Sequence, residues 1–254
     1  MASIWTYLLL GAVQGATEFL PVSSSGHLTL LEHLLGLKPS LSLNVLLHLG
    51  TLIALLLYFQ RDLKDILKRL KEHTTFLAGV TVMTIVTAAI GLPLKKLGIL
   101  ERVGVLPISF SATTALLLLS LRAARGDRSL KELSWKDAIL IGLAQGIAVI
   151  PGISRSGATI VTAMLLGYSP EEAFKLSFIG GIPAVVGAVI VELPDMTREI
   201  HLSLGLAGML TSLIVGLSAL ELLKRVTVRG RISWFSLWTA LAAACSIIII
   251  LKGG

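Results

Sequence analysis

The sequence predicts an all-α integral membrane protein built as an inverted-topology repeat, in which each half holds a re-entrant helix pair followed by three transmembrane helices. Three observations lead to this prediction: the apolar composition, six long apolar runs and an internal repeat. The 254 residues are 54% hydrophobic and only 15% charged, with a mean hydropathy of +0.86. Soluble domains carry about 25% charged residues, so this composition argues strongly against one. The length fits a single transmembrane domain over residues 1–254.

Six apolar runs have the length of membrane-spanning helices, which need about 20 residues, or somewhat fewer where flanking side chains reach the interface. They cover residues 43–59, 75–92, 104–121, 174–192, 204–223 and 234–251. Tyr58, Phe59, Trp234 and Trp238 stand at the ends of runs, where interfacial aromatic residues are common. We therefore expect six membrane spans.

Two further apolar regions, 4–37 and 138–166, are each interrupted by a polar turn. The first is broken by Gln14, Glu18 and the stretch PVSSSGH, and the second by PGISRSG. This shape is typical of two half-length helices that enter and leave the membrane by the same face. The alternative is one complete helix followed by an interfacial segment.

An internal repeat relates the two halves of the chain at an offset of 131 residues. Ten identities recur in register, several of them polar or glycine: Gly11, Gln14, Gly15, Ser23, Ser25, Gly26, Leu34, Leu35, Gly36 and Gly50 match Gly142, Gln145, Gly146, Ser154, Ser156, Gly157, Leu165, Leu166, Gly167 and Gly181. The repeats extend over approximately 4–121 and 135–251. Because each half holds an odd number of spans, the second half is expected upside down relative to the first.

The basic residues predict the orientation. In the expected topology one side holds fifteen Lys and Arg, in the stretches 60–73, 122–136 and 224–231 and at Lys175, and the other side holds six: Lys38, Lys95, Lys96, Arg102, Arg198 and Lys252. The positive-inside rule makes the richer side cytoplasmic and places both termini outside the cell membrane. The two broken pairs then enter from opposite faces, so that their polar tips meet near mid-membrane. The net charge of +7 is explained by this topology and by membrane lipids as partners, and no nucleic-acid partner is expected.

Other functional signals are missing from the sequence. The one cysteine, Cys245, lies in an apolar run, so neither a disulfide nor a thiolate metal site is expected. No positive residue precedes Lys38, so we expect no cleaved signal peptide. Walker, dinucleotide-binding and zinc-binding motifs do not occur, and we assign no residue to a metal cluster.

Three ionisable residues, Glu18, His27 and Arg155, lie in the interrupted regions and cannot easily stay at a membrane surface. An ionisable group at depth costs a few kcal/mol, so it usually has a partner and a function. Gln14 and Glu18 are four residues apart and share one helix face. Glu18 and His27 belong to one half and Arg155 to the other, as expected if a symmetric scaffold later gained chemistry.

Each interrupted region also places hydroxyl groups at the start of a helix, where unpaired backbone N–H groups and the helix dipole favour an anion. The residues at these two starts are Ser23, Ser24, Ser25 and Gly26 in the first half, and Ser154, Arg155, Ser156, Gly157 and Thr159 in the second. With the guanidinium of Arg155, they predict a binding site for phosphate, whose geometry an arginine matches.

Structural explanations exist for the same residues. Serines before a helix are often plain N-caps, and a Glu18–Arg155 ion pair could simply join the repeats. His27 could be satisfied by backbone, and Gln14, which recurs as Gln145, could belong to the scaffold. His48 is interpreted as a packed or interhelical histidine.

At this point the sequence resembles the undecaprenyl-diphosphate phosphatases of the bacitracin-resistance type over essentially the whole chain. The resemblance is carried by QGATEFLPVSSSGH at 14–27 and PGISRSGAT at 151–159. It implies a membrane hydrolase that removes the terminal phosphate of a C55 polyprenyl diphosphate and yields the lipid monophosphate carrier of cell-wall precursors. It also implies support by a divalent cation, Mg²⁺ or Ca²⁺, and a site towards the outer face. Position 14 is Gln where many members have Glu, which puts any role of a second carboxylate in doubt.

Combining the residues with this resemblance gives a hypothesis for the site. Substrate binding is assigned to Gln14, Ser23, Ser25, Gly26, Gly152, Ser154, Ser156, Gly157 and Thr159, and catalysis to Glu18, Ser24, His27 and Arg155. Arg155 stabilises the phosphoryl transition state, and Glu18 positions the cation or acts as a base. Ser24 is the candidate nucleophile with His27 as its base; in the alternatives, His27 activates water or is itself the nucleophile.

Two other classes of function remain compatible with the pattern. Inverted repeats with broken helices around an anion site are typical of secondary transporters, and a non-catalytic binder of lipid phosphates is a third class. The set Glu18, Ser24, His27 and Arg155 contains more acid–base groups than anion binding requires, which favours an enzyme. The metal, the preferred lipid length and the formation of a homodimer stay open.

Overall fold

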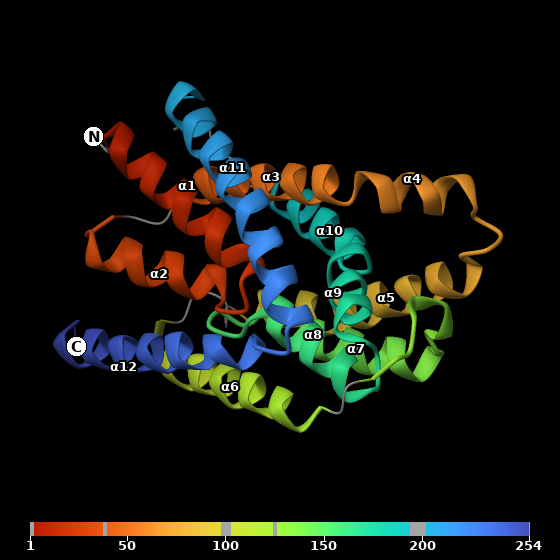
Figure 1. Ribbon diagram of the computed structural model, residues 1–254. Coiled ribbons are helices and arrows are strands. Elements are labelled where there is room, and N and C mark those ends of the chain that lie inside the picture. Colours follow the sequence, from red (N-terminus) through yellow and green to blue (C-terminus); the bar gives the residue numbers. More distant parts are fainter. Residues whose placement is uncertain (1–2, 38–39, 98–102, 124–125, 194–201, 254) are drawn as a thin grey trace.

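The computed structural model describes residues 3–37, 40–97, 103–123, 126–193 and 202–253, and the regular elements of these segments are all helices (Figure 1). The α-helices are α1 Ile4–Phe19, α2 Ser24–Leu34, α3 Leu41–Tyr58, α4 Gln60–Lys68, α5 Thr74–Lys96, α6 Leu106–Leu119, α7 Trp135–Ile147, α8 Arg155–Leu165, α9 Pro170–Ile179, α10 Ile182–Glu192, α11 Leu202–Val228 and α12 Phe235–Gly253. Short 3₁₀ helices lie at η2 Val103–Val105, η3 Ser120–Arg122, η4 Leu130–Glu132 and η6 Ile232–Trp234.

Six segments of the described chain are long and apolar enough to cross a membrane, which confirms the six predicted spans and an all-α, multi-pass membrane protein. They are Leu41–Tyr58, Thr74–Lys96, Val103–Arg122, Pro170–Val191, Leu202–Val228 and Ile232–Leu251. The fourth differs from the continuous helix expected over 174–192. It begins at Pro170, after Ser169 accepts a hydrogen bond from the Glu172 backbone N–H, and it is divided into α9 and α10 at Gly180 and Gly181.

Four of the basic residues counted for the orientation, Lys38, Arg102, Arg125 and Arg198, lie outside the described residues. The side chain of Lys252 is likewise not described. Residues 60–68 of the stretch 60–73, treated above only as a charged connection, form the short amphipathic helix α4, which buries Ile66.

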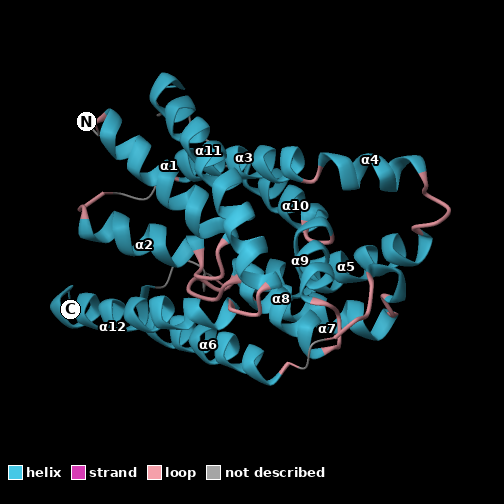
Figure 2. Cartoon of the chain, in the orientation of Figure 1, coloured by secondary structure: helices cyan, strands magenta, loops and turns pink. Residues whose placement is uncertain are grey.

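The two interrupted regions fold as helical hairpins, the first hairpin (α1–α2) and the second hairpin (α7–α8). Pro21 follows the end of α1, and Ser23 caps α2 by accepting a hydrogen bond from the Gly26 N–H at 3.4 Å. Gly152, with a φ of +92°, lies in the turn before α8, whose cap is Ser154. In Figure 1, α1 begins and α2 ends on the side that holds both termini, whereas α7 begins on the opposite side. Figure 2 shows the connecting loops gathered at the centre of the molecule.

Each hairpin packs through its first helix against a long helix of the other half of the chain. α1 packs on α11, and α7 packs on α5. Glycines allow the close approach, because a Cβ at Gly15 would lie 3.0 Å from the Cα of Ser212 and one at Gly142 would lie 2.9 Å from the Met83 carbonyl oxygen. α6 and α12 pair with each other. The two halves are therefore interlocked.

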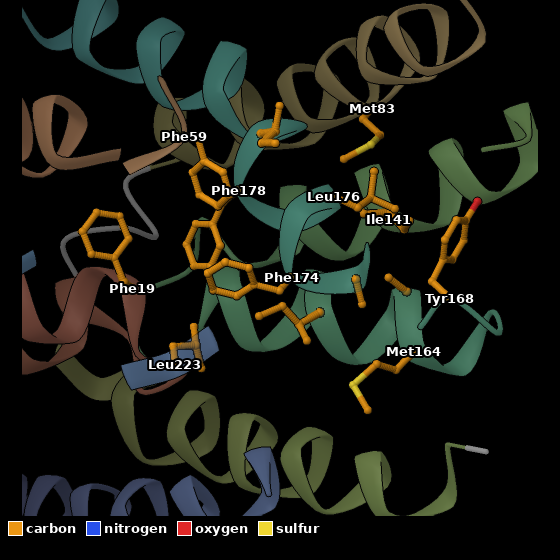
Figure 3. Close-up of a cluster of buried hydrophobic side chains, with 14 of the residues drawn as sticks. Phe19, Phe59, Met83, Ile141, Met164, Tyr168, Phe174, Leu176, Phe178 and Leu223 are labelled. Carbon is orange, nitrogen blue, oxygen red and sulfur yellow. The ribbon is translucent and has the colours of Figure 1, made fainter. Parts of the chain in front are cut away.

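An aromatic core lies beside the tip of the first hairpin (Figure 3). The ring of Phe178 lies 4.9 Å from that of Phe174, 5.7 Å from Phe19 and 6.3 Å from Phe59, measured between centroids. Aromatic pairs at such distances contribute about 0.5–1.5 kcal/mol beyond their buried area. Since Phe19 is the last residue of α1, this packing fixes the position of its neighbour Glu18.

A polar cluster of Arg128, Asp137 and Tyr168 ties the open end of the second hairpin together. Asp137 Oδ2 accepts hydrogen bonds from Arg128 Nη2 at 2.6 Å and from the Tyr168 hydroxyl at 3.0 Å. The Arg128 guanidinium stacks on the Tyr168 ring at 4.5 Å and donates to the Leu166 carbonyl at the end of α8. Burial alone raises the pKa of Asp137, but the hydrogen bonds from Arg128, Ser134 and Tyr168 outweigh it and hold that pKa below its ordinary value.

Candidate active site

The tips of the two hairpins touch through glycine and serine. The Gly152 N–H donates a hydrogen bond of 3.0 Å to Ser23 Oγ, and Ser23 itself has a φ of +71°. A Cβ on Gly26 would lie 3.0 Å from the Cα of Gly152 and 2.6 Å from Cζ of Phe110, and one on Gly157 would lie 3.2 Å from Cβ of Pro21. These glycines, predicted as ligands of the substrate, therefore also bring the two backbones together.

The Glu18 carboxylate is hydrogen-bonded to side chains from both halves of the chain. Its Oε2 accepts hydrogen bonds from Gln14 Nε2 at 3.1 Å and from Ser24 Oγ at 2.6 Å, and its Oε1 accepts one from Arg155 Nη2 at 3.1 Å. The Glu18 side chain is 10% exposed and that of Arg155 19%. Removing either partner would leave an uncompensated charge in a largely buried place, so the two side chains depend on each other. The Glu18–Arg155 pairing, one of the structural explanations above, is thus present and lies within the predicted site.

The serine cap of the second hairpin is held mainly by its own loop. Ser154 Oγ accepts from the Gly157 N–H at 3.1 Å and lies 3.3 Å from Ser156 Oγ. The hydroxyl of Thr159 donates to the Arg155 carbonyl at 2.9 Å and contacts Ser177 Oγ. Ser154, Ser156 and Thr159 are buried. The interpretation of Ser23 and Ser154 as N-caps is therefore confirmed, and their direct contact with a phosphate stays a prediction.

His27, proposed as the base for Ser24, is hydrogen-bonded instead to the backbone and to Trp238 of α12. Its Nδ1 is 2.8 Å from the Ser23 carbonyl oxygen, which can only accept, so Nδ1 carries the proton. Its Nε2 accepts a hydrogen bond of 2.8 Å from the Trp238 indole N–H, and the two rings stack. The Ser24 hydroxyl donates to Glu18 instead. In this arrangement the proton acceptor nearest to Ser24 is Glu18, and a role of His27 as base stays a prediction.

Three buried side-chain atoms at the site have no hydrogen-bond partner: Gln14 Oε1, Gln145 Oε1 and Arg155 Nη1. The last two face the same space, since each lies 3.2 Å from the position that a Cβ of Gly181 would take. Buried polar atoms are normally paired, and unpaired ones indicate a site for water, an ion or a substrate. Donor and acceptor capacity is thus available around the Glu18–Arg155 pair.

Residues that sequence reasoning missed complete the surroundings of the site. Thr113 accepts from the Ser154 N–H at 3.1 Å and donates to the Gly152 carbonyl at 2.8 Å, and Thr87 accepts from Gln145 Nε2 at 3.0 Å. Trp238 was interpreted only as an interfacial aromatic residue. All three stand far along the chain from their partners, so no local pattern marks them.

His48, interpreted as a packed or interhelical histidine, reaches the site from α3. Its Nε2 lies 3.9 Å from Glu18 Oε2, and its Nδ1 lies 2.8 Å from the Asn44 carbonyl oxygen. In the described segments, no three His, Cys, Asp or Glu side chains gather as they do in an all-protein metal site. Any cation here would need further ligands from amides, water or phosphate.

Comparison with known proteins gives the family of the chain. Residues 7–245 match the family model described as bacitracin resistance protein BacA. The chain is 35% identical to an undecaprenyl-diphosphatase of Thermosipho melanesiensis, over 95% of this chain and 98% of the relative. It is 36% identical to one of Carboxydothermus hydrogenoformans over 97% of each chain, and 35% identical to undecaprenyl-diphosphatase 3 of Bacillus anthracis over 97% of this chain and 98% of the relative.

A family match over nearly the whole chain, relatives of similar length and a site formed from both resemblance motifs lead to the same assignment. The chain belongs to the bacitracin resistance protein BacA family.

Proposed function

We infer that this protein is an undecaprenyl-diphosphatase, an enzyme that removes the terminal phosphate of undecaprenyl diphosphate and yields the monophosphate that carries cell-wall precursors. The names of its relatives support this activity. The observation that carries the proposal is the set Ser24–Glu18–Arg155, assembled from both hairpins by two hydrogen bonds to one carboxylate. The nucleophile Ser24 and the phosphate-binding guanidinium of Arg155 thereby both contact Glu18, which can accept the serine proton.

The geometry suggests the following reaction. Ser24 Oγ attacks the terminal phosphorus while its proton passes to Glu18 Oε2, and the bond from that phosphorus to the bridging oxygen breaks. Undecaprenyl monophosphate leaves, and water then hydrolyses the phosphoserine to release inorganic phosphate. Arg155 stabilises the charge on the phosphoryl oxygens through Nη1, which has no protein partner, and through Nη2 when that group exchanges Glu18 for substrate. Direct attack by water or by His27 is the alternative.

A divalent cation, Mg²⁺ or Ca²⁺, is proposed at Glu18. The donor set fits a hard cation, because the Glu18 carboxylate is buried near the free amide oxygen of the Gln14 side chain. When bound, such an ion neutralises charge on the phosphate oxygens. Glu18 and Gln14 would hold it, and the substrate diphosphate would supply further oxygen ligands.

We propose that the halves form an inverted repeat whose re-entrant hairpins enter the cell membrane from opposite faces, with both termini outside. The reciprocal packing of α1 on α11 and of α7 on α5 supports this, because α5 and α11 are equivalent in the two repeats. The contact of Gly152 with Ser23 supports tips that meet inside the membrane. The polyprenyl tail of the substrate would lie among the apolar helices.

The test is phosphate release from C55 polyprenyl diphosphate by the purified full-length protein in detergent. We expect wild-type protein to release phosphate, EDTA to stop the release, and Arg155→Ala to lower kcat by about 10²–10³-fold, as for loss of an oxyanion-stabilising donor. Arg69→Ala, which removes an arginine from the exposed pair with Asp65, is the matched control and should keep the wild-type rate. Thermal unfolding of each variant checks the fold.

Wild-type-like turnover in Arg155→Ala would contradict the proposed site. Bound lipid with no phosphate release from the wild-type protein would contradict the enzyme and favour a carrier or transporter of the phosphorylated lipid, since broken-helix repeats serve transport as well.

A further inference from the structure

The contact between His48 and Glu18 brings two hydrogen-bond acceptor atoms close together. His48 donates through Nδ1 to the Asn44 carbonyl oxygen, so the neutral ring carries its lone pair on Nε2. That nitrogen lies 3.9 Å from Glu18 Oε2, which is too far for a direct hydrogen bond. Two acceptors at this separation are stabilised by a positive group between them.

A single metal ion can bond both atoms. Metal–ligand bonds to imidazole nitrogen and carboxylate oxygen are about 2.0 to 2.5 Å long, so an ion lying between the two groups spans the 3.9 Å separation. Metal-binding histidines commonly donate their other ring N–H to a backbone carbonyl, and His48 does so to Asn44.

A third ligand of the right kind is close to Glu18. Gln14 is fully buried and its Nε2 is bonded to Glu18, while its Oε1 has no hydrogen-bond partner. An amide oxygen is a normal ligand of divalent cations. Where a glutamate at position 14 would supply charge, this chain offers a neutral amide together with an imidazole from another helix.

We propose that His48 is a ligand of the divalent cation, with Glu18 and the amide oxygen of Gln14. This deepens the proposed function, because it names the protein donors of the cation that supports it. Mn²⁺ accepts the same oxygen ligands as Mg²⁺ or Ca²⁺ and also binds imidazole nitrogen, so it is the probe that reports a histidine ligand at this site.

The experiment uses Mn²⁺ alone with the purified full-length protein in detergent and no lipid. Electron paramagnetic resonance measures free Mn²⁺ during a titration, and pulsed measurements on bound Mn²⁺ detect a directly bonded imidazole nitrogen. We expect wild-type protein to bind Mn²⁺ with a nitrogen coupling. His48→Gln should remove that coupling and weaken Mn²⁺ binding by about 10- to 100-fold, with a smaller effect on Ca²⁺, measured by competition.

His33→Gln is the matched control, because His33 is an exposed histidine at the end of α2 and should leave both measurements unchanged. A wild-type protein that binds no Mn²⁺, or binds it without nitrogen coupling, would overturn the proposal. The same holds if His48→Gln binds Mn²⁺ as tightly as wild type, which would leave His48 as a neighbour of Glu18 outside the metal site.

Failure here is distinguishable from failure of the proposed function. Phosphate release by a protein whose Mn²⁺ shows no nitrogen coupling leaves the phosphatase intact and removes His48 from the metal site. Bound Mn²⁺ that shows the nitrogen coupling, in a protein that releases no phosphate, would keep His48 as a metal ligand and contradict the phosphatase.

Discussion

Ser24 makes the shortest hydrogen bond to Glu18, at 2.6 Å. Because that contact leaves the hydroxyl proton beside a carboxylate, we expect Ser24→Ala to lower kcat by at least about 10²-fold, a typical contribution of positioned proton transfer, with little change in KM. Phosphate release under single-turnover conditions measures this directly.

Ser24→Cys serves as the comparison, because it keeps a nucleophilic atom at the same place. Retention of a phosphorylated intermediate by that variant would support attack by residue 24. A Ser24→Ala protein with the wild-type rate would instead favour attack by water or by His27.

At the scale of single residues, the structure brings Glu18, Ser24 and Arg155 together as the sequence predicted, but other hydrogen-bond partners could not be predicted. Buried ionisable groups need compensation, so Glu18 and Arg155 could be paired from the sequence alone. His27 could not be paired with Trp238, because the contact joins residues 211 positions apart on helices whose packing no periodic pattern records. His48 was interpreted as a packed or interhelical histidine, and its partner Glu18 on α1 could not be named for the same reason.

Among the helical elements, the contact of the hairpin tips depends on glycine. Gly26→Ala would place a Cβ against Phe110 and the backbone of Gly152, so we expect a loss of roughly 1–3 kcal/mol in unfolding free energy, as for other overpacked sites, with lower turnover. Gly187→Ala in α10 is the control, because a Cβ there meets no atom within 4 Å. A lower Tm for Gly187→Ala than for Gly26→Ala would contradict this account of the tips.

The cluster at the open end of the second hairpin predicts a dependence on pH. The folded-state pKa of Asp137 lies below the unfolded value of about 3.9. Its stabilising effect is therefore present above that unfolded value and is lost as the pH falls through the folded-state pKa. We expect the Tm of the wild-type protein to fall more steeply below about pH 4 than that of Asp137→Asn. Parallel curves from pH 7 to 3 would exclude Asp137 as the cause.

Helix boundaries could be predicted where the polarity of the sequence changes. They could not be predicted where the polarity stays the same. The six spans were predicted because apolar runs of that length are typical of membrane-spanning helices. The division between α9 and α10 was not, since Gly180 and Gly181 interrupt the helix without interrupting the apolar run. The amphipathic helix α4 was hidden by the charges of the stretch 60–73.

For the whole molecule, the proposed topology makes opposite ends of the helices accessible from opposite sides. In a Cys245→Ala background, Ser3→Cys should react with a membrane-impermeant maleimide on intact cells, because both termini are proposed to lie outside. Glu72→Cys, in the exposed connection between α4 and α5, should react only after permeabilisation. Labelling in the opposite order would reverse the orientation, and equal labelling of both on intact cells would contradict the topology.

The repeat at an offset of 131 predicted which helices are equivalent, but not which of them pack together. Sequence identity reports common ancestry, whereas the exchange of α5 and α11 between the halves is a result of packing. Glu18 and Arg155 lie at the tips of the two hairpins, which are in contact through Gly152 and Ser23.

The packing of α1 on α11 also sets an order in time. α1 is made first, yet the helix that supports it begins only at Leu202, so at synthesis rates of about 5–20 residues per second α1 waits at least about ten seconds for its partner. Until then Glu18 is an acidic group on a short helix without its final neighbours. A nascent chain released before Leu202 would carry both signature motifs and still lack a formed site, so the capacity for phosphate release arises only near the end of biosynthesis.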